Sequence, residues 1–311
     1  MGKIASIDIG SNTLRFLIAE KRGEGFRLVF RDREIVRLGG NFYPHRLLSA
    51  QAMEAAVKVL GRFKIRAEQE GVSRIIAAGT GVLREAENIS FFLERVDRET
   101  GVSVKILKGP EEARIMAKGV FSVFPSTFGK TIIFDVGGGS TEFVVVNDGQ
   151  IGRRTSLPLG VVGLTERFLR SNPPTKNEAD SLKVHCQNIL KKNLPKNDKI
   201  NRLIGTAGTI TTLAAMAKNL CDYDPEKINK TVLTKEYLIE LSKKILALSF
   251  NQRAELTGLE TGRADIIAAG ILLVLEVMDY FSQESLLVSD AGLLEGLILE
   301  TRFVAGYGLR V

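Results

Sequence analysis

The chain has 311 residues, 44% of them hydrophobic and 25% charged, which is typical of a globular protein and excludes disordered and fibrous classes. Its net charge of +7 favours anionic ligands, because a positive potential raises the rate at which anions are encountered. Two cysteines fit neither a disulfide framework nor a metal site, and the longest apolar stretch, 266–274, is too short to span a bilayer. We therefore expect a cytoplasmic protein without a membrane partner.

The first half of the chain is predicted to form three strands followed by alternating helices and strands. Apolar runs typical of strands cover 4–7, 14–19, 26–37, 75–78 and 102–107. Helical patterns cover 49–70, 89–99 and 111–121. Ser49 is the expected N-cap of the first helix and Gly71 its stop signal, while Pro110 opens the third.

The second half repeats this scheme, with a boundary expected near 125–129. Three strands are predicted at 131–134, 143–146 and 151–157, followed by helices that begin near Val161 and Thr175. A strand at 201–204 leads directly into a helix, and a last strand is expected at 285–288. Further helices are predicted at 235–248, 264–280 and 293–301. The recurrence of one scheme in both halves indicates duplication of a supersecondary unit.

Two glycine-containing turns, each headed by an aspartate, are the most informative feature of the sequence. They read Asp8-Ile-Gly-Ser-Asn-Thr13 and Asp135-Val-Gly-Gly-Gly-Ser-Thr-Glu142, and each joins two predicted strands. Such a turn offers backbone N–H groups to an oxyanion such as phosphate. Its aspartate can hold a divalent cation, usually through water. A single copy is compatible with an ordinary hairpin, but two copies with the same residue order predict a clamp that holds a phosphate chain from both sides.

These turns and four further segments closely resemble the motifs of the exopolyphosphatase / guanosine pentaphosphatase (Ppx/GppA) family. The further segments are Pro110-Glu-Glu-Ala-Arg114, Leu157-Pro-Leu-Gly-Val161, Arg263-Ala-Asp265 and Ser289-Asp-Ala-Gly292. The resemblance covers essentially the whole chain and is to the short, two-domain form of the family. It implies an α/β fold of two duplicated ribonuclease H-like domains, of the actin, sugar kinase and chaperone ATPase superfamily, that face each other across a cleft.

The resemblance also implies domain limits. The first ribonuclease H-like domain would comprise 1–124 and a C-terminal helix at about 293–311. The second would comprise 125–292.

The resemblance assigns Glu112, with its neighbour Glu111, to catalysis. In that scheme Glu112 activates the water that attacks the terminal phosphorus. From the residues alone, two acids in the first turn of a helix are explained by compensation of the helix dipole, and it is the resemblance that favours the catalytic role.

Phosphate oxygens are expected to bind the two turns and a third segment. The expected binding residues are Ser11, Asn12, Thr13, Thr80, Arg84, Gly137, Gly138, Gly139, Ser140 and Thr141. Arg15 is a weaker candidate. A guanidinium such as that of Arg84 binds phosphate in a bidentate fork, although a surface ion pair with Glu85 or Glu87 is the alternative role.

A magnesium ion is the expected cofactor, with manganese as the alternative. Asp135 and Glu142, together with Asp8, are its expected ligands. Two carboxylates about 4 Å apart repel by roughly 4 kcal/mol at an effective dielectric constant near 20. A divalent cation removes that cost and neutralises phosphate oxygens. Whether Asp8 contacts the metal directly or through water is left open.

The segment Gly205-Thr-Ala-Gly208 resembles the nucleoside-contacting turn of the superfamily. Gly205, Thr206 and Gly208 would then form a nucleotide rim with Arg263 and Asp265. The alternatives are close helix–strand packing for the glycines and a structural ion pair for Arg263 and Asp265.

The predicted activity is hydrolysis of a terminal phosphoanhydride. The substrate is linear polyphosphate, the 5′-γ-phosphate of guanosine pentaphosphate, or both. The expected partners are therefore polyphosphate and guanosine penta- or tetraphosphate, with no nucleic acid. Whether two copies of the chain form a homodimer is left open. Two alternatives stay open, namely an ATP-dependent kinase of the same superfamily and a non-catalytic sensor of guanosine tetraphosphate.

Overall fold

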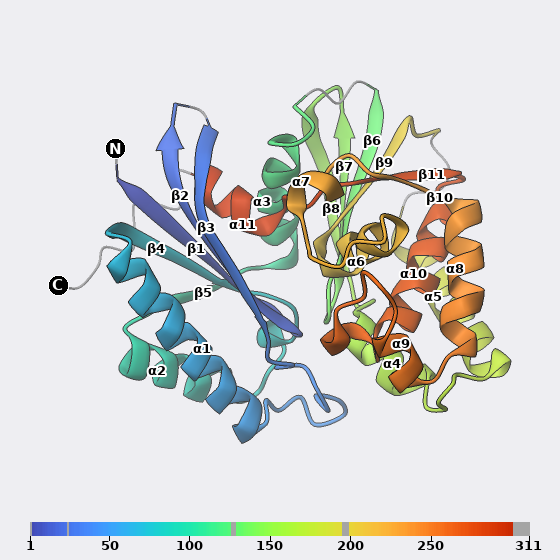
Figure 1. The fold of residues 1–311 in the computed structure, drawn as a ribbon, viewed down its shortest axis with the longest axis horizontal. Helices are drawn as coiled ribbons and strands as arrows, with labels where there is room; N and C mark the ends of the chain where they lie inside the picture. Colours follow the sequence, from blue (N-terminus) through green and yellow to red (C-terminus); the bar gives the residue numbers. More distant parts are fainter. Residues whose placement is uncertain (1, 24, 126–128, 195–198, 301–311) are drawn as a thin grey trace. The chain divides into compact units, whose positions relative to one another are not determined.

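The structure is a computed structural model that describes residues 2–23, 25–125, 129–194 and 199–300 (Figure 1). Contacts within the chain divide it into two compact units. Unit 1 comprises Met1–Ser122 and Gly292–Val311, and unit 2 comprises Val123–Ala291. Within the described residues, no helix combines the length and the apolar character needed to cross a membrane.

The described residues of unit 1 form a five-stranded sheet and four α-helices. Its strands are β1 Lys3–Ile9, β2 Thr13–Arg22, β3 Gly25–Ile35, β4 Val72–Gly79 and β5 Val104–Ile106. Its helices are α1 Ala50–Gln69, the 3-10 helix η1 Gly81–Arg84, α2 Ile89–Thr100, α3 Gly109–Phe121 and α11 Leu293–Leu299. As predicted, the side chain of Ser49 caps α1 by accepting from the amide of Ala52.

Unit 2 contains a six-stranded sheet and a larger set of helices. Its strands are β6 Lys130–Val136, β7 Thr141–Asn147, β8 Gln150–Leu157, β9 Arg202–Thr206, β10 Val232–Thr234 and β11 Ser285–Val288. Its helices are α4 Val161–Phe168, α5 Lys176–Asn193, α6 Ala207–Ala217, α7 Pro225–Ile228, α8 Lys235–Ala247, α9 Phe250–Ala254, η2 Thr261–Arg263 and α10 Ile267–Tyr280.

The two sheets share one topology, so the predicted duplicated α/β fold is confirmed. The strand order is β3-β2-β1-β4-β5 in unit 1 and β8-β7-β6-β9-β11-β10 in unit 2. In both units the first three strands are antiparallel neighbours, and the next two pair in parallel. β10, antiparallel to β11, is the only strand of unit 2 without a counterpart among the described residues of unit 1.

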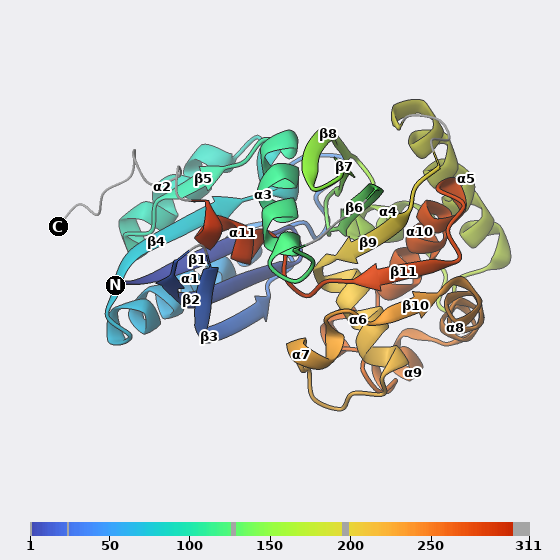
Figure 2. The same cartoon turned by 90° about the horizontal axis from the view of Figure 1, so that it is seen from above.

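Alternation along the strands of unit 1 explains why helices cover both faces of its sheet (Figure 2). Ile7 and Ile9 point into a core cluster formed with α1 and α2. Leu17 and Ala19 point the other way, towards α11, in a second cluster. Strands that are buried on both faces read as nearly continuous apolar runs, which is how they were recognised in the sequence.

Helix α11 crosses α3 at a contact between backbones. A β-carbon on Gly119 would lie 1.8 Å from the carbonyl oxygen of Gly292, and one on Gly296 would lie 1.9 Å from that of Ile115. Glu300, after α11, is buried and pairs with Arg114 on α3. The segment after Ala291 therefore returns to unit 1 and fixes α3, the helix that carries Glu111 and Glu112.

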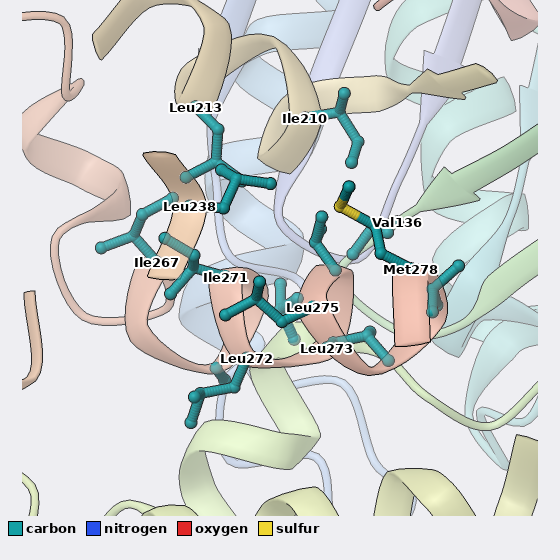
Figure 3. Close-up of a cluster of buried hydrophobic side chains, with 14 of the residues drawn as sticks. Val136, Ile210, Leu213, Leu238, Ile267, Ile271, Leu272, Leu273, Leu275 and Met278 are labelled. Atoms are coloured by element: carbon teal, nitrogen blue, oxygen red, sulfur yellow. The ribbon is translucent and has the colours of Figure 1, made fainter. Parts of the chain in front are cut away.

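The core of unit 2 is built around α10, which is apolar on all sides (Figure 3). Its side chains pack against α6 and α8 and against Val136 at the end of β6. The helix begins at Ile267, so the start predicted at residue 264 was wrong, because residues 264–266 form a turn after η2.

Other differences from the prediction concern short or terminal elements. β10, with three residues, is too short to show a period and was missed, as were α7 and α9. α11 ends at Leu299, two residues before the end predicted for the last helix at residue 301, and the longer C-terminal helix expected to about residue 311 falls mostly on residues that are not described. Residues 301–311 lie outside the described residues, as does most of the predicted boundary at 125–129.

Candidate functional site

The first turn, residues 10–13, joins β1 to β2 and is closed by a hydrogen bond from the Gly10 amide to the Thr13 carbonyl at 3.1 Å. Its outer carbonyls are held by the chain that follows β3. The Ser11 and Asn12 carbonyls accept from backbone amides within 36–39, at 2.7 to 3.0 Å. The hydroxyl of Ser11 is also engaged, since it accepts from a backbone amide of η1.

The glycine turn, residues 137–140, has the same closure in unit 2. The Gly137 amide donates to the Ser140 carbonyl at 3.0 Å. Here the carbonyls are held by a helix rather than by a loop. The Gly137 and Gly138 carbonyls accept from the amides of Val161 and Val162, at 3.1 and 3.0 Å, and these are the first two residues of α4.

Both turns consequently present backbone amides. A trans peptide group is planar, so the N–H of one residue points away from the carbonyl of the residue before it. Within the part of the chain that the structure describes, the amides of Ser11 and Asn12, and likewise those of Gly138 and Gly139, donate to no group. Each turn thus offers two neighbouring N–H groups, the arrangement that binds an oxyanion.

Asp8 and Arg15 form an ion pair beside the first turn. They lie opposite each other in the register of β1 and β2. One carboxylate oxygen of Asp8 accepts from both Nε and Nη2 of Arg15, at 2.9 and 2.5 Å, and the other accepts from the Thr80 hydroxyl at 3.4 Å. Arg15 therefore compensates the charge of the buried Asp8, where a magnesium contact was predicted.

The two acids at the start of α3 point in different directions. Consecutive residues of a helix differ by about 100° around its axis. Glu112 is buried and pairs with Arg84 of η1, whereas Glu111 is more exposed and pairs with Lys105 of β5 at 2.8 Å. The structure thus brings together the predicted base and the predicted phosphate-binding arginine, and it places Glu111 apart from them.

The acids of unit 2 form a buried carboxylate pair. Asp135 and Glu142 lie opposite each other in the register of β6 and β7, so their side chains share one face of the sheet. One oxygen of Glu142 accepts from the hydroxyls of Ser140 and Ser156, at 2.7 and 2.8 Å. Glu142 occupies the position that Arg15 has in unit 1, so the two turns differ in charge at equivalent sites.

These two acids fit a magnesium site. Mg²⁺ is usually held by one or two carboxylates together with water and phosphate oxygens. Two buried carboxylates in register repel each other unless a cation or another donor compensates them. Among the described residues, no three acidic, histidine or cysteine side chains are arranged to hold a metal. A metal here would thus take its remaining ligands from water and substrate.

Thr141, another predicted phosphate contact, has its hydroxyl engaged within unit 2, like those of Ser11, Thr80 and Ser140 within their own units. Its hydroxyl is fully buried and donates to the Leu159 carbonyl at 2.6 Å. It ties β7 to the segment that leads into α4.

The predicted nucleotide rim consists of tightly packed backbone and one arginine. The Thr206 hydroxyl is buried and donates to the Ala291 carbonyl at 3.0 Å. The Arg263 guanidinium lies over Gly208, where a β-carbon would come within 2.4 Å of it. Arg263 also pairs with Glu260 at 3.1 Å.

The remaining rim residues are Gly205 and Asp265. Gly205 belongs to β9, directly before Thr206. Asp265 lies near Arg253. Burial lowers the pKa of the Arg253 guanidinium, and the negative charge of Asp265 opposes that shift. The structure supports close packing at the Gly205–Gly208 turn, where a β-carbon on Gly208 would collide with the Arg263 guanidinium.

Sequence reasoning missed Ser156 and Gly160. Both lie in or beside the Leu157-Pro-Leu-Gly-Val161 segment, which was recognised only as a motif. A signal for Ser156 existed in the strand register, since pairing β7 with β8 places it opposite Glu142.

The sequence pattern of the Ppx/GppA phosphatase family matches residues 17–302. Three curated relatives illustrate the range of similar proteins. A bifunctional 3-dehydroquinate synthase/phosphatase of Fusobacterium nucleatum is 34% identical over 95% of this chain and 46% of its own length. Exopolyphosphatase 2 of Mycobacterium tuberculosis is 28% identical over 96% of this chain and 98% of its own. A guanosine-5′-triphosphate,3′-diphosphate pyrophosphatase of Aliivibrio fischeri is 25% identical over 94% of this chain and 58% of its own.

A solved structure shows the same similarity to the Ppx/GppA family. The Aquifex aeolicus PPX-GPPA enzyme is 33% identical to this chain, and the match covers 96% of this chain and 99% of that one, with a TM-score of 0.81. The Mycobacterium relative and the Aquifex structure each match this chain over nearly their full lengths. The chain spans only about half the length of the Fusobacterium and Aliivibrio proteins.

Proposed function

The chain belongs to the Ppx/GppA phosphatase family, and on that premise we propose that it releases orthophosphate from the end of linear polyphosphate. The observation that carries the proposal is the pair of equivalent turns, each with two backbone amides that have no partner within the described structure. Polyphosphate is the first candidate because the exopolyphosphatase relative is matched over 98% of its length. The net charge of +7 favours a long polyanion as well.

Binding is assigned to the amides of the two turns. The Ser11 and Asn12 amides and the Gly138 and Gly139 amides would donate to phosphate oxygens. These donors are fixed before substrate arrives, because the turn carbonyls are already held by other parts of each unit. Fixed dipoles stabilise developing charge without reorganisation, and this is the main source of catalysis in phosphoryl transfer.

Glu112 is assigned as the base that orients or deprotonates the attacking water. Its burial and its pairing with Arg84 place a carboxylate beside a guanidinium that suits a phosphate oxygen. When phosphate recruits Arg84, the Glu112 carboxylate would be released to accept a hydrogen bond from water. Glu111, paired with Lys105, is not needed for this role.

Asp135 and Glu142 are the residues that would hold Mg²⁺ or Mn²⁺. A bound divalent cation neutralises phosphate oxygens and stabilises the charge that develops on them. The Ser140 and Ser156 hydroxyls would keep the Glu142 carboxylate in one orientation. Asp8 has a smaller part in this proposal, because Arg15 already compensates its charge.

Guanosine pentaphosphate is the second candidate substrate. The observation in its favour is the similarity to the Aliivibrio guanosine-5′-triphosphate,3′-diphosphate pyrophosphatase, which extends over 94% of this chain. Both substrates end in the same phosphoanhydride, so the turns do not distinguish them.

The test is orthophosphate release by the purified protein with Mg²⁺, on long-chain polyphosphate, guanosine pentaphosphate and ATP in parallel. We expect release from polyphosphate, and we expect Glu112→Gln to lower kcat by about 10²- to 10⁴-fold, as for loss of a general base. Glu111→Gln is the matched control on the same helix and should retain activity. Full activity of Glu112→Gln would exclude Glu112 as the base. Consumption of ATP only with an added acceptor would indicate a kinase, and tight guanosine tetraphosphate binding with no release from any substrate would indicate a sensor.

The metal assignment has a separate test. A chelator should abolish release and added Mg²⁺ should restore it. Asp135→Asn should raise the Mg²⁺ concentration needed for half-maximal activity, and Mn²⁺ binding followed by electron paramagnetic resonance should weaken in parallel. Unchanged Mn²⁺ binding in Asp135→Asn would place the metal elsewhere.

A further inference from the structure

Gly160, the residue before α4, lies directly against the glycine turn. A β-carbon on Gly160 would lie 2.2 Å from the carbonyl carbon of Gly139 and 2.3 Å from the carbonyl oxygen of Gly138. Ordinary contacts of a β-carbon begin near 3.4 Å. All three of its nearest atoms belong to backbone, so no side chain can move aside to make room. Only glycine allows this approach.

The close approach lets α4 orient the peptide groups of the turn. The amides of Val161 and Val162 donate to the Gly137 and Gly138 carbonyls, so these carbonyls point towards α4. The N–H groups of Gly138 and Gly139 then point away from the helix, because each peptide group is planar and trans. The two peptide dipoles are thereby aligned with the α4 dipole, whose N-terminus is positive.

A second contact ties the same segment to β7. The Thr141 hydroxyl donates to the Leu159 carbonyl at 2.6 Å, one residue before Gly160. In the first turn, by contrast, the carbonyls accept from backbone amides of the loop at 36–39. The two turns share a backbone conformation, but different elements hold their carbonyls, and α4 holds only those of the glycine turn.

We propose that Gly160 is a positioning residue, which keeps the glycine turn in its phosphate-binding conformation by letting the first amides of α4 reach the turn carbonyls. This inference rests on the proposed function of the turn. A methyl group at Gly160 would separate the turn from α4 by roughly 1 Å, and a displacement of that size can lower a rate about 100-fold. The two exposed amides would lose their common direction, so both transition-state stabilisation and phosphate binding would weaken.

The experiment compares wild type with Gly160→Ala and with Gly61→Ala as control. A β-carbon on Gly61, in α1, meets only a methyl group at 3.9 Å, so the control adds the same atom without a clash. We expect Gly160→Ala to lower kcat for phosphate release about 100-fold, with a smaller change in KM, and Gly61→Ala to keep wild-type activity. Wild-type kinetics in a folded Gly160→Ala protein would overturn the inference.

A spectroscopic measurement separates positioning from general loss of structure. Protein labelled with ¹⁵N-glycine is titrated with inorganic phosphate, and the amide signals of Gly138 and Gly139 are followed. In wild type both should shift, and in Gly160→Ala the shifts should disappear while signals of distant glycines stay in place. Retention of both shifts in Gly160→Ala would contradict the proposal.

Thr141→Val is a second variant that tests the same inference if Gly160→Ala does not fold. It removes one hydrogen bond without adding volume and should lower kcat about 10-fold and weaken the same two shifts. Unaltered kinetics and shifts in Thr141→Val would count against the inference. A wild-type protein that releases no phosphate from any substrate would instead refute the proposed function, and the phosphate-induced shifts would still decide the role of Gly160.

Discussion

The crossing of α3 and α11 allows a prediction in which the same substitution has opposite effects at two sites. Gly119→Ala places a methyl carbon 1.8 Å from the Gly292 carbonyl oxygen, about 1.5 Å closer than ordinary contact. Both partners are backbone, so the helices must separate. Overpacking of this kind costs about 1–3 kcal/mol. Gly61→Ala, in α1, meets only a methyl group at 3.9 Å and should gain about 0.5–1 kcal/mol from helix propensity.

The assay is thermal unfolding followed by circular dichroism at 222 nm. For a unit of this size, 1 kcal/mol corresponds to roughly 3–4 °C in midpoint. We expect Gly119→Ala to lower the midpoint by about 4–10 °C and Gly61→Ala to raise it by about 2–4 °C. Because α3 carries Glu112, kcat should fall in Gly119→Ala and stay unchanged in Gly61→Ala. If Gly119→Ala were as stable as wild type, the close approach of these helices would be refuted.

Three further predictions concern stability. Hydrogen bonds from Thr175 lower the pKa of Glu178 to about 2, so its contribution is present above pH 4.5 and is lost as pH falls towards 2. The difference in midpoint between wild type and Glu178→Gln should shrink over that range, and a constant difference would contradict the assignment. Burial raises the pKa of Glu276 although Gln187 donates to it, so ionised Glu276 destabilises the fold as pH rises above 4.5. Glu276→Gln should therefore be more stable than wild type at pH 7 but not at pH 4, as measured by urea unfolding at both values. The Thr131 hydroxyl is fully buried without a hydrogen-bond partner in the described structure, so Thr131→Val should raise stability by about 1 kcal/mol, and a loss would show a hidden partner.

Much of the fold was predictable because its signals are local. The apolar strands, the N-cap at Ser49 and the capping box of Thr175 and Glu178 depend on residues within a few positions of each other. The short elements β10 and α9 were missed because neither shows a period of its own or a run of strand-forming apolar residues. The start of α10 was misplaced because apolar composition alone does not separate a turn from a helix.

The candidate site was predictable as a set of residues but not as a set of contacts. Asp8, Glu112 and the two turns were identified from motif order. The sequence did not predict that Asp8 pairs with Arg15. Nor did it predict that Glu112 pairs with Arg84 and that Glu111 lies apart from them. These pairs join residues from different elements, and the choice among several nearby opposite charges depends on strand register and helix rotation.

The sequence by itself determined the duplicated strand-turn-strand units and the family, because turn residues and strand periodicity act over a few positions. Only the tertiary structure decided which way the peptide groups of the glycine turn point. That direction depends on Gly160 and on the first amides of α4, which lie some twenty positions further along the chain. A backbone hydrogen bond between distant segments leaves no residue pattern of its own, except for the glycine that makes room for it.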